Sequence, residues 1–251
     1  MNETAAPQAP LSPHWGVLAT LVWSVPIAVA FIALQVAALI AVIRLAWFGV
    51  PPGRVEDLMA WSASNGSMIA FSSVVSTIGC VALIAGIIKL KKGAKLRDYL
   101  ALNTVPARTL AKWVGFTVVY IAVSDFLTYS LGRSIVPEFM LDAYASAQPA
   151  WLFWIALVLG APLFEETFFR GFLFRGLQAS VLGAAGTVIV TALLWTAIHT
   201  QYDLYWLTHV LAAGLLIGAA RVATRSLYVP MAMHATLNLV ATVETVILLK
   251  P

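Results

Sequence analysis

Long apolar runs are the feature that most constrains what this chain can fold into. Seven of them are predicted to be helices: residues 16–48, 67–90, 110–132, 150–178, 183–200, 205–222 and 227–249. A hydrocarbon core of about 30 Å needs roughly 20 apolar residues per helical span. The sequence therefore predicts an all-α, polytopic transmembrane helical bundle with seven spans, or eight if the first run breaks at Pro26.

The composition agrees with a membrane protein. Hydrophobic residues make up 61% of the chain and charged residues only 10%, whereas soluble domains are about one quarter charged. A net charge of +4 could suit a nucleic-acid partner, but basic residues in membrane proteins usually mark cytoplasmic loops. We therefore expect the lipid bilayer as a partner and no nucleic acid. The single cysteine, Cys80, excludes a disulfide within the chain and a cysteine-based metal cluster.

The domain organisation is simple. Residues 1–15 are expected to form a disordered lead, and their first fourteen residues lack the basic segment of a signal peptide. Residues 16–251 are expected to form a single transmembrane domain. The polar, turn-rich connector 48–66 is expected to include a short interfacial helix before Asn65.

The connector 89–112 predicts the orientation of the bundle. It holds seven basic residues against one acid, Asp98, and a basic excess in a short loop marks the cytoplasmic side. Counting the spans from this loop places Arg175, Arg221 and Arg225 on the same side. The short loops and compact length are typical of a prokaryotic protein, which we expect in the cell membrane.

Three charged residues interrupt the apolar run 150–178, namely Glu165, Glu166 and Arg170. A charge at membrane depth costs roughly 2.5–3.5 kcal/mol on insertion scales, so these residues suggest a functional site. Arg170 follows Glu166 by four residues and can pair with it along one helical face. That pair could be purely structural, but it would leave Glu165 as an unpaired carboxylate suited to proton transfer.

Further polar side chains lie in later apolar runs. His199 ends one run, and His234 and Asn238 are four residues apart on one face of another. Each of them alone could simply form a hydrogen bond between helices. Together with the glutamates they provide a base, a residue that holds water and hydrogen-bond donors, as a water-activating hydrolase requires.

Three short motifs carry a resemblance to a known family. They are "EETFFR" (165–170), "WTAIH" (195–199) and "HATLN" (234–238). They resemble E-E-x3-R, aromatic-x3-H and H-x3-N/D of the CAAX-protease and bacteriocin self-immunity family, also called CPBP or Abi, of intramembrane endopeptidases. The protease-like core is expected at about 150–245. Trp195 stands where the family usually has phenylalanine, and "GLLIG" (214–218) resembles a glycine-bearing segment that predicts close helix packing.

The resemblance implies a role for each matching residue. Glu165 would activate a water molecule with help from His199, and His234 and Asn238 would stabilise the oxyanion. Glu166 and Arg170 would position the site, with Trp195 in support. The implied substrate is a peptide or a membrane protein, with or without a lipid group.

Two alternatives stay open at this point. We expect no cofactor, but Glu165, His199 and His234 could also bind zinc, although no H-E-x2-H motif is present. The chain could also be non-proteolytic, either a proton-coupled transporter or a self-immunity binding protein. Repeated halves and interrupted helices, which are typical of transporters, are not evident. Asp125 and His209 also lie in apolar runs and have no assigned role.

Overall fold

A computed structural model describes residues 13–250, which contain helices and no strand. The longer helices are α1 (Val17–Leu45), α3 (Gly66–Leu90), α5 (Ala107–Ser130), α10 (Gly183–Ala197), α11 (Leu204–Thr224) and α12 (Tyr228–Leu249). The short elements are η1 (Trp47–Gly49), α2 (Val55–Ser64), α4 (Leu96–Tyr99) and α6 (Glu138–Ser146). A continuous central helix comprises α7 (Ala150–Trp154), η2 (Ile155–Gly160), α8 (Ala161–Glu166), η3 (Thr167–Leu173) and α9 (Phe174–Leu177).

Within the described residues, six helices are long and apolar enough to cross a membrane: α1, α3, α5, the central helix, α11 and α12. The predicted polytopic helical bundle is confirmed. The expected span at 183–200 is shorter than predicted, because α10 ends after 15 residues and the chain turns before α11. Pro26 does not break the first run, since it lies inside a continuous α1, and prolines are tolerated in transmembrane helices.

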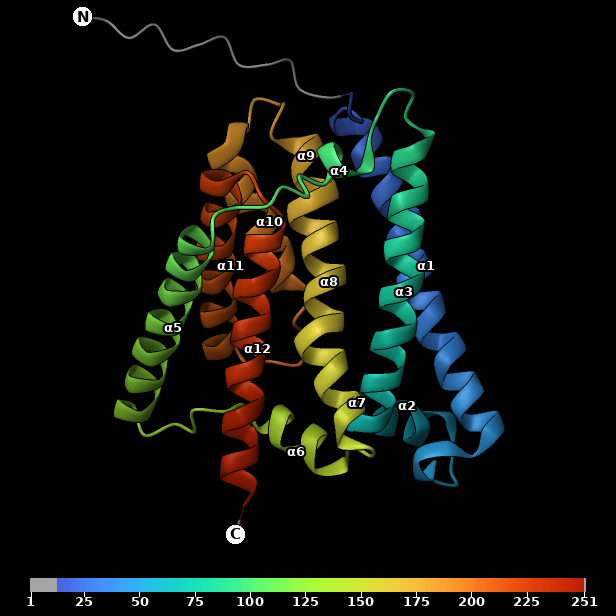
Figure 1. The fold of residues 1–251 in the computed structure, drawn as a ribbon. Helices are drawn as coiled ribbons and strands as arrows, with labels where there is room; N and C mark the ends of the chain where they lie inside the picture. The colour runs from blue at the N-terminus through green and yellow to red at the C-terminus, as the bar shows by residue number, and fades with distance from the viewer. Residues whose placement is uncertain (1–12, 251) are drawn as a thin grey trace, which may run out of the picture.

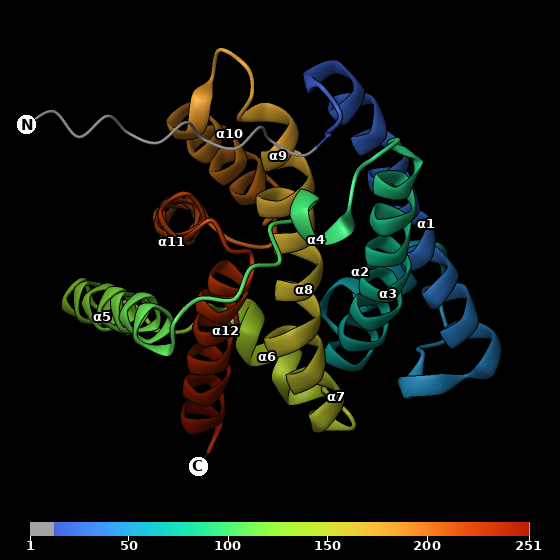
Figure 2. The same ribbon diagram turned by 45° about the horizontal axis from the view of Figure 1, so that its top comes forward.

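The central helix runs through the middle of the bundle in both overall views (Figures 1 and 2). α1 and α3 pack together on one side of it, and α5, α10, α11 and α12 lie on the other. The predicted short helix in the connector 48–66 is present as α2. The part of the expected lead that spans residues 1–12 lies outside the described residues.

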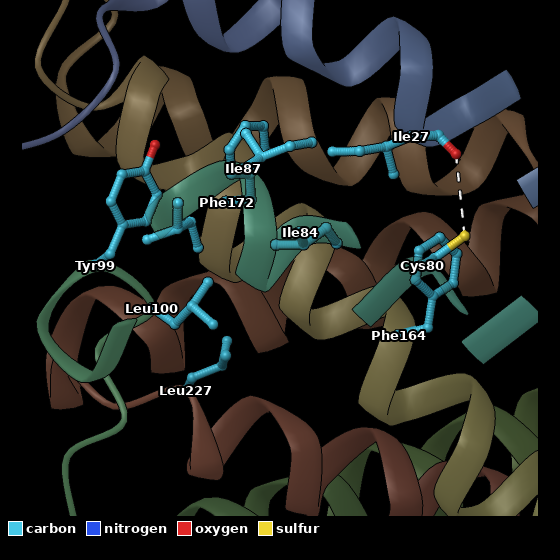
Figure 3. Packing of buried hydrophobic residues seen from close by; sticks show 10 residues of the cluster. Ile27, Cys80, Ile84, Ile87, Tyr99, Leu100, Phe164, Phe172 and Leu227 are labelled. Carbon is cyan, nitrogen blue, oxygen red and sulfur yellow. Dashed lines mark hydrogen bonds between the residues drawn. The ribbon is translucent and has the colours of Figure 1, made fainter. Parts of the chain in front are cut away.

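A hydrophobic cluster fastens α1 and α3 to the central helix (Figure 3). Its buried members include Ile27, Ile84, Phe164 and Phe172, and the Cys80 thiol lies 4.0 Å from the Ile27 carbonyl oxygen. Tyr99, Leu100 and Leu227 extend the same cluster toward the basic connector. This face of the central helix is therefore filled by packing.

Arg225 lies at the same end of the bundle as the basic connector 89–112, as the sequence predicts. Asn103 donates its side-chain N–H to the Arg225 carbonyl oxygen at 2.9 Å, and Ser226 Oγ donates to the Asn103 carbonyl oxygen at 2.6 Å. The Leu227 N–H also donates to the Ala101 carbonyl oxygen at 2.9 Å. The cytoplasmic location of this end stays a prediction.

Candidate active site

π-helical turns flank the segment that carries the two glutamates. α8 lies between η2 and η3, and such turns are frequent at functional sites. In η2 the Ala161 N–H donates to the Ala156 carbonyl oxygen, five residues earlier. In the same register, the Leu157 carbonyl would need the N–H of residue 162, which is a proline and has none.

Asn238 supplies the missing donor. Its Nδ2 donates to the Leu157 carbonyl oxygen at 2.8 Å, so α12 is tied to the irregular turn of the central helix. The side-chain amide carries two N–H groups, and this bond uses one of them. The second N–H of Asn238 is therefore left for another acceptor.

Glu166 is completely buried, and one of its carboxylate oxygens accepts two hydrogen bonds. Its Oε1 accepts from Arg170 Nη1 at 3.1 Å and from His234 Nδ1 at 2.9 Å. The predicted Glu166–Arg170 pair is confirmed, and His234 joins it. Arg170 Nη2 also donates to the Gly214 carbonyl oxygen at 3.2 Å, which ties the central helix to α11. These hydrogen bonds fix which faces of α11 and α12 point toward the Glu166–Arg170 pair.

Glu165 is half-buried and has no ion pair among the described residues, which agrees with its prediction as the unpaired carboxylate. Its Oε2 nevertheless accepts a hydrogen bond from Trp195 Nε1 at 2.5 Å. His199 Nδ1 lies 2.7 Å from the Trp195 carbonyl oxygen. Because a carbonyl oxygen can only accept, Nδ1 carries the proton, and the neutral imidazole keeps its lone pair on Nε2.

The three motifs meet around the buried Trp195 ring. The ring centroid lies 5.0 Å from that of His199 and 5.1 Å from that of His234, both in edge-to-face geometry. The Arg170 guanidinium carbon lies 4.6 Å from the centre of the indole ring. The structure thus brings together all seven residues that the sequence proposed for the site.

The predicted close packing of the "GLLIG" segment is also confirmed. A Cβ atom at Gly214 would lie 3.0 Å from Trp195 Cε3, and one at Gly218 would lie 2.7 Å from Val188 Cγ1. Such distances are tighter than ordinary side-chain contacts allow. Glycine at these two positions lets α10 and α11 approach each other, which holds the Trp195 ring in place.

A cavity of about 160 Å³ opens beside these residues. His199, His234 and Asn238 contribute to its wall, as do Asp125 and His209. His199, His234 and Asn238 therefore converge on one cavity, and His209 borders it in addition to its local bond to the Tyr205 carbonyl oxygen at 3.0 Å. The cavity is large enough to hold several water molecules.

Sequence reasoning missed Tyr202 and Glu244, which also line the cavity. The Tyr202 ring stacks on that of His199 with centroids 6.0 Å apart and an interplanar angle of 19°. Burial raises the pKa of the Tyr202 phenol to about 12, and the negative charge of Glu165 adds to this effect. In the sequence, Tyr202 follows His199 by three residues. This spacing was not informative, because the two residues are joined by a turn, where helical periodicity does not apply.

The zinc alternative requires several ligand side chains around one ion. Among residues 13–250, no group of three or more His, Cys, Asp or Glu side chains is arranged to hold a metal ion. His199 and His234 both direct Nδ1 to protein oxygens. These contacts leave Nε2 of both rings without a protein partner in this part of the chain, so the zinc alternative for Glu165, His199 and His234 stays a prediction.

Comparisons with known proteins agree with the motifs. Residues 147–240 match the family model described as "Type II CAAX prenyl endopeptidase Rce1-like". An "Uncharacterized 24.3 kDa protein" of Escherichia coli is 30% identical over 128 residues, which cover 47% of this chain and 55% of that protein. The chain thus spans about half the length of this curated relative, and no solved structure matches it. The matched segment contains all three motifs, so over residues 147–240 this multi-pass membrane chain is similar to the CAAX-protease (CPBP) family.

Proposed function

We propose that the chain is an intramembrane endopeptidase that hydrolyses a peptide bond with a water molecule activated by Glu165 and His199. The observation that carries this proposal is the anchoring of both side chains on Trp195, at 2.5 Å and 2.7 Å. His199 also contributes to the wall of the cavity beside them. A carboxylate and an imidazole lone pair beside such a cavity can hold and deprotonate water.

In the proposed first step, Glu165 takes a proton from the water through Oε1, since Oε2 already accepts the indole N–H. His199 Nε2 accepts a hydrogen bond from the same water. The water oxygen attacks the carbonyl carbon of the scissile bond. The proton held by Glu165 then passes to the departing nitrogen, the C–N bond breaks, and the products are a carboxylic acid and an amine.

His234 and Asn238 would stabilise the oxyanion formed in that step. His234 Nδ1 already donates to Glu166, so Nε2 can donate only when the ring is an imidazolium. Asn238 offers its second amide N–H, since the first is used by Leu157. Each donor of this kind is worth about 3 kcal/mol of transition-state stabilisation.

The proposed substrate is a peptide segment of a membrane-associated protein. The cavity lies within a bundle that spans the membrane, so the scissile segment has to enter in extended form. We further propose a prokaryotic cell membrane as the location, with the connector 89–112 on the cytoplasmic side. The description of the matched family as a prenyl endopeptidase selects a prenylated peptide as the first probe.

The test uses the full-length chain, purified in detergent, and a quenched fluorogenic peptide ending in a farnesylated Cys-aliphatic-aliphatic-X sequence. The same peptide without the farnesyl group shows whether the lipid is recognised. Glu165→Gln, His199→Ala and His234→Ala are each expected to reduce kcat by 10² to 10⁴-fold. Glu138→Gln, an exposed acid on α6, is the matched control and should leave cleavage unchanged.

Three outcomes would contradict parts of the proposal. Full cleavage by Glu165→Gln would exclude Glu165 as the base. Peptide binding without cleavage by the wild-type chain would favour a non-proteolytic binding protein. A stoichiometric metal that is lost together with activity on chelation would exclude the metal-independent scheme.

A further inference from the structure

Trp195 makes two polar contacts, one from its side chain and one from its backbone. Its indole N–H donates to Glu165 Oε2 at 2.5 Å, and its carbonyl oxygen lies 2.7 Å from His199 Nδ1. A single residue therefore contacts both members of the proposed water-activating pair. The backbone contact would persist with any residue at this position, whereas the contact to Glu165 needs the indole N–H.

Glu165 depends on this contact for its position. Among the described residues, the hydrogen bond from Trp195 is the one formed by the Glu165 side chain, and no cation pairs with it. A half-buried glutamate without an anchor has three side-chain torsions free to change. The indole N–H therefore selects one orientation and leaves Oε1 unoccupied by protein.

The indole itself is buried and closely packed, so it cannot easily turn away. Arg170 lies over the ring at 4.6 Å, and Gly214 on α11 allows close approach, since a Cβ there would lie 3.0 Å from Trp195 Cε3. A cation on the ring face withdraws electron density and makes the indole N–H a better donor. Arg170 is also fixed by its ion pair with Glu166, so the ring is tied to both glutamates.

We propose that Trp195 is a positioning residue: its N–H and its carbonyl oxygen orient Glu165 and His199 so that Oε1 and Nε2 address the same water molecule. This inference rests on the proposed function, because it assigns a task within the same reaction. It makes Trp195 more than an aromatic filler in the "WTAIH" motif. A phenylalanine there retains the ring but supplies no donor.

A spectroscopic test examines the contact without reference to activity. The chain has nine tryptophans, and indole ¹⁵N labelling gives one cross-peak for each. The peak lost in Trp195→Phe, or in Trp195→Tyr if the first variant does not fold, identifies Trp195. In Glu165→Gln we expect the proton shift of this peak to move upfield, because a neutral amide oxygen accepts more weakly than a carboxylate. Glu138→Gln should leave the peak in place, and an unmoved peak in Glu165→Gln would overturn the proposal.

A kinetic test with the same peptides separates positioning from packing. Trp195→Phe is expected to lower kcat by roughly tenfold or more with KM within about twofold, since a hydrogen bond to a charged group is lost. Trp61→Phe on α2 is the control and should change neither constant. Unchanged kcat, or a rise in KM alone, would show that the ring only shapes the cavity.

The two tests give different results depending on whether the proposed function or the positioning role of Trp195 is wrong. If the wild-type chain cleaves neither peptide, the proposed function fails, while the cross-peak still reports the Trp195–Glu165 contact. If cleavage occurs and Glu165→Gln abolishes it, but Trp195→Phe retains full kcat, only the positioning role is overturned. Combining Trp195→Phe with Glu165→Gln should add no further loss, because both act on the same carboxylate.

Discussion

Asn238 on α12 donates to the carbonyl oxygen of Leu157 in the central helix at 2.8 Å, and this bond replaces one that Pro162 cannot make. The irregular turn η2 and the proline together expose a backbone acceptor in the interior of the bundle. An unsatisfied buried carbonyl is costly, so the amide at 238 stabilises the fold as well as facing the cavity.

The first prediction concerns the coupling of these two positions. Asn238→Ala should lower the free energy of unfolding by about 1–3 kcal/mol, because the Leu157 carbonyl loses its partner. In a Pro162→Ala background the new backbone N–H can reach that carbonyl, so the cost of Asn238→Ala should shrink. A double-mutant cycle followed by thermal or denaturant unfolding in detergent measures the coupling. Equal costs in both backgrounds would show that the proline is not the cause.

The two glutamates should differ sharply in their effect on stability. Glu166→Gln leaves the buried Arg170 without its counter-charge, and breaking a buried pair typically costs about 3–5 kcal/mol. Glu165→Gln should cost less than about 1 kcal/mol, because Glu165 is half-buried, pairs with no cation among the described residues and can still accept the indole N–H as glutamine. Thermal unfolding of the two variants side by side checks this order. A larger loss in Glu165→Gln would reverse the structural and catalytic assignments.

Asp203 at the start of α11 should make stability depend on pH. The Trp206 N–H and the Arg133 guanidinium lower the pKa of Asp203 below its ordinary value. A lowered folded-state pKa contributes stability above the unfolded value of about 3.9, and this contribution disappears as pH falls through the folded value. The difference in Tm between wild type and Asp203→Ala should therefore be constant from about pH 5 to 8 and narrow below about pH 4.

Asp203→Asn separates the two contributions in that experiment. It keeps the oxygen that caps α11 but removes the charge that pairs with Arg133. Its Tm should fall between those of wild type and Asp203→Ala at neutral pH. A pH-independent difference for Asp203→Ala would contradict the assigned role of the carboxylate charge.

Two glycines of α3 provide a matched test of helix packing. A Cβ at Gly66 would lie 1.8 Å from the backbone oxygen of Ala143 on α6, so Gly66→Ala must push two backbones apart. It should destabilise the fold by about 1–3 kcal/mol. Gly86 meets nothing within 4 Å, so Gly86→Ala should be neutral or stabilise by up to about 1 kcal/mol. Thermal unfolding of both variants checks the contrast. Similar changes in Tm for the two variants would contradict the close packing of α3 against α6 at Gly66.

Substitutions of Tyr202 can show whether its ring or its hydroxyl group contributes to peptide cleavage. Its pKa of about 12 keeps the phenol neutral throughout the working range, and its ring stacks on that of His199. Tyr202→Phe should keep the rate profile of peptide cleavage unchanged between about pH 6 and 10. Tyr202→Ala should lower kcat because the His199 ring loses its stacking partner. A large loss in Tyr202→Phe would indicate that the hydroxyl itself takes part.

Local patterns predicted much of the fold. The lengths of the apolar runs predicted the six long helices, because the hydrocarbon thickness sets the number of residues in a span. The Glu166–Arg170 pair followed from i,i+4 spacing, which is a property of one helix. The run 183–200 has the same composition as its neighbours, but α10 ends at Ala197 because the chain turns there to begin α11. Composition alone does not report where a helix stops.

The chain's own residues thus determined the membrane class, the central pair and the three motifs, because each depends on hydrophobicity or on spacing within one helix. Only the tertiary structure decided the hydrogen bonds between the helices. These bonds join His234 to Glu166, Asn238 to the Leu157 carbonyl oxygen, and Trp195 to Glu165. These contacts depend on how α10 and α12 are rotated against the central helix. That rotation is set by packing between helices, such as Gly214 against Trp195, which no single segment encodes.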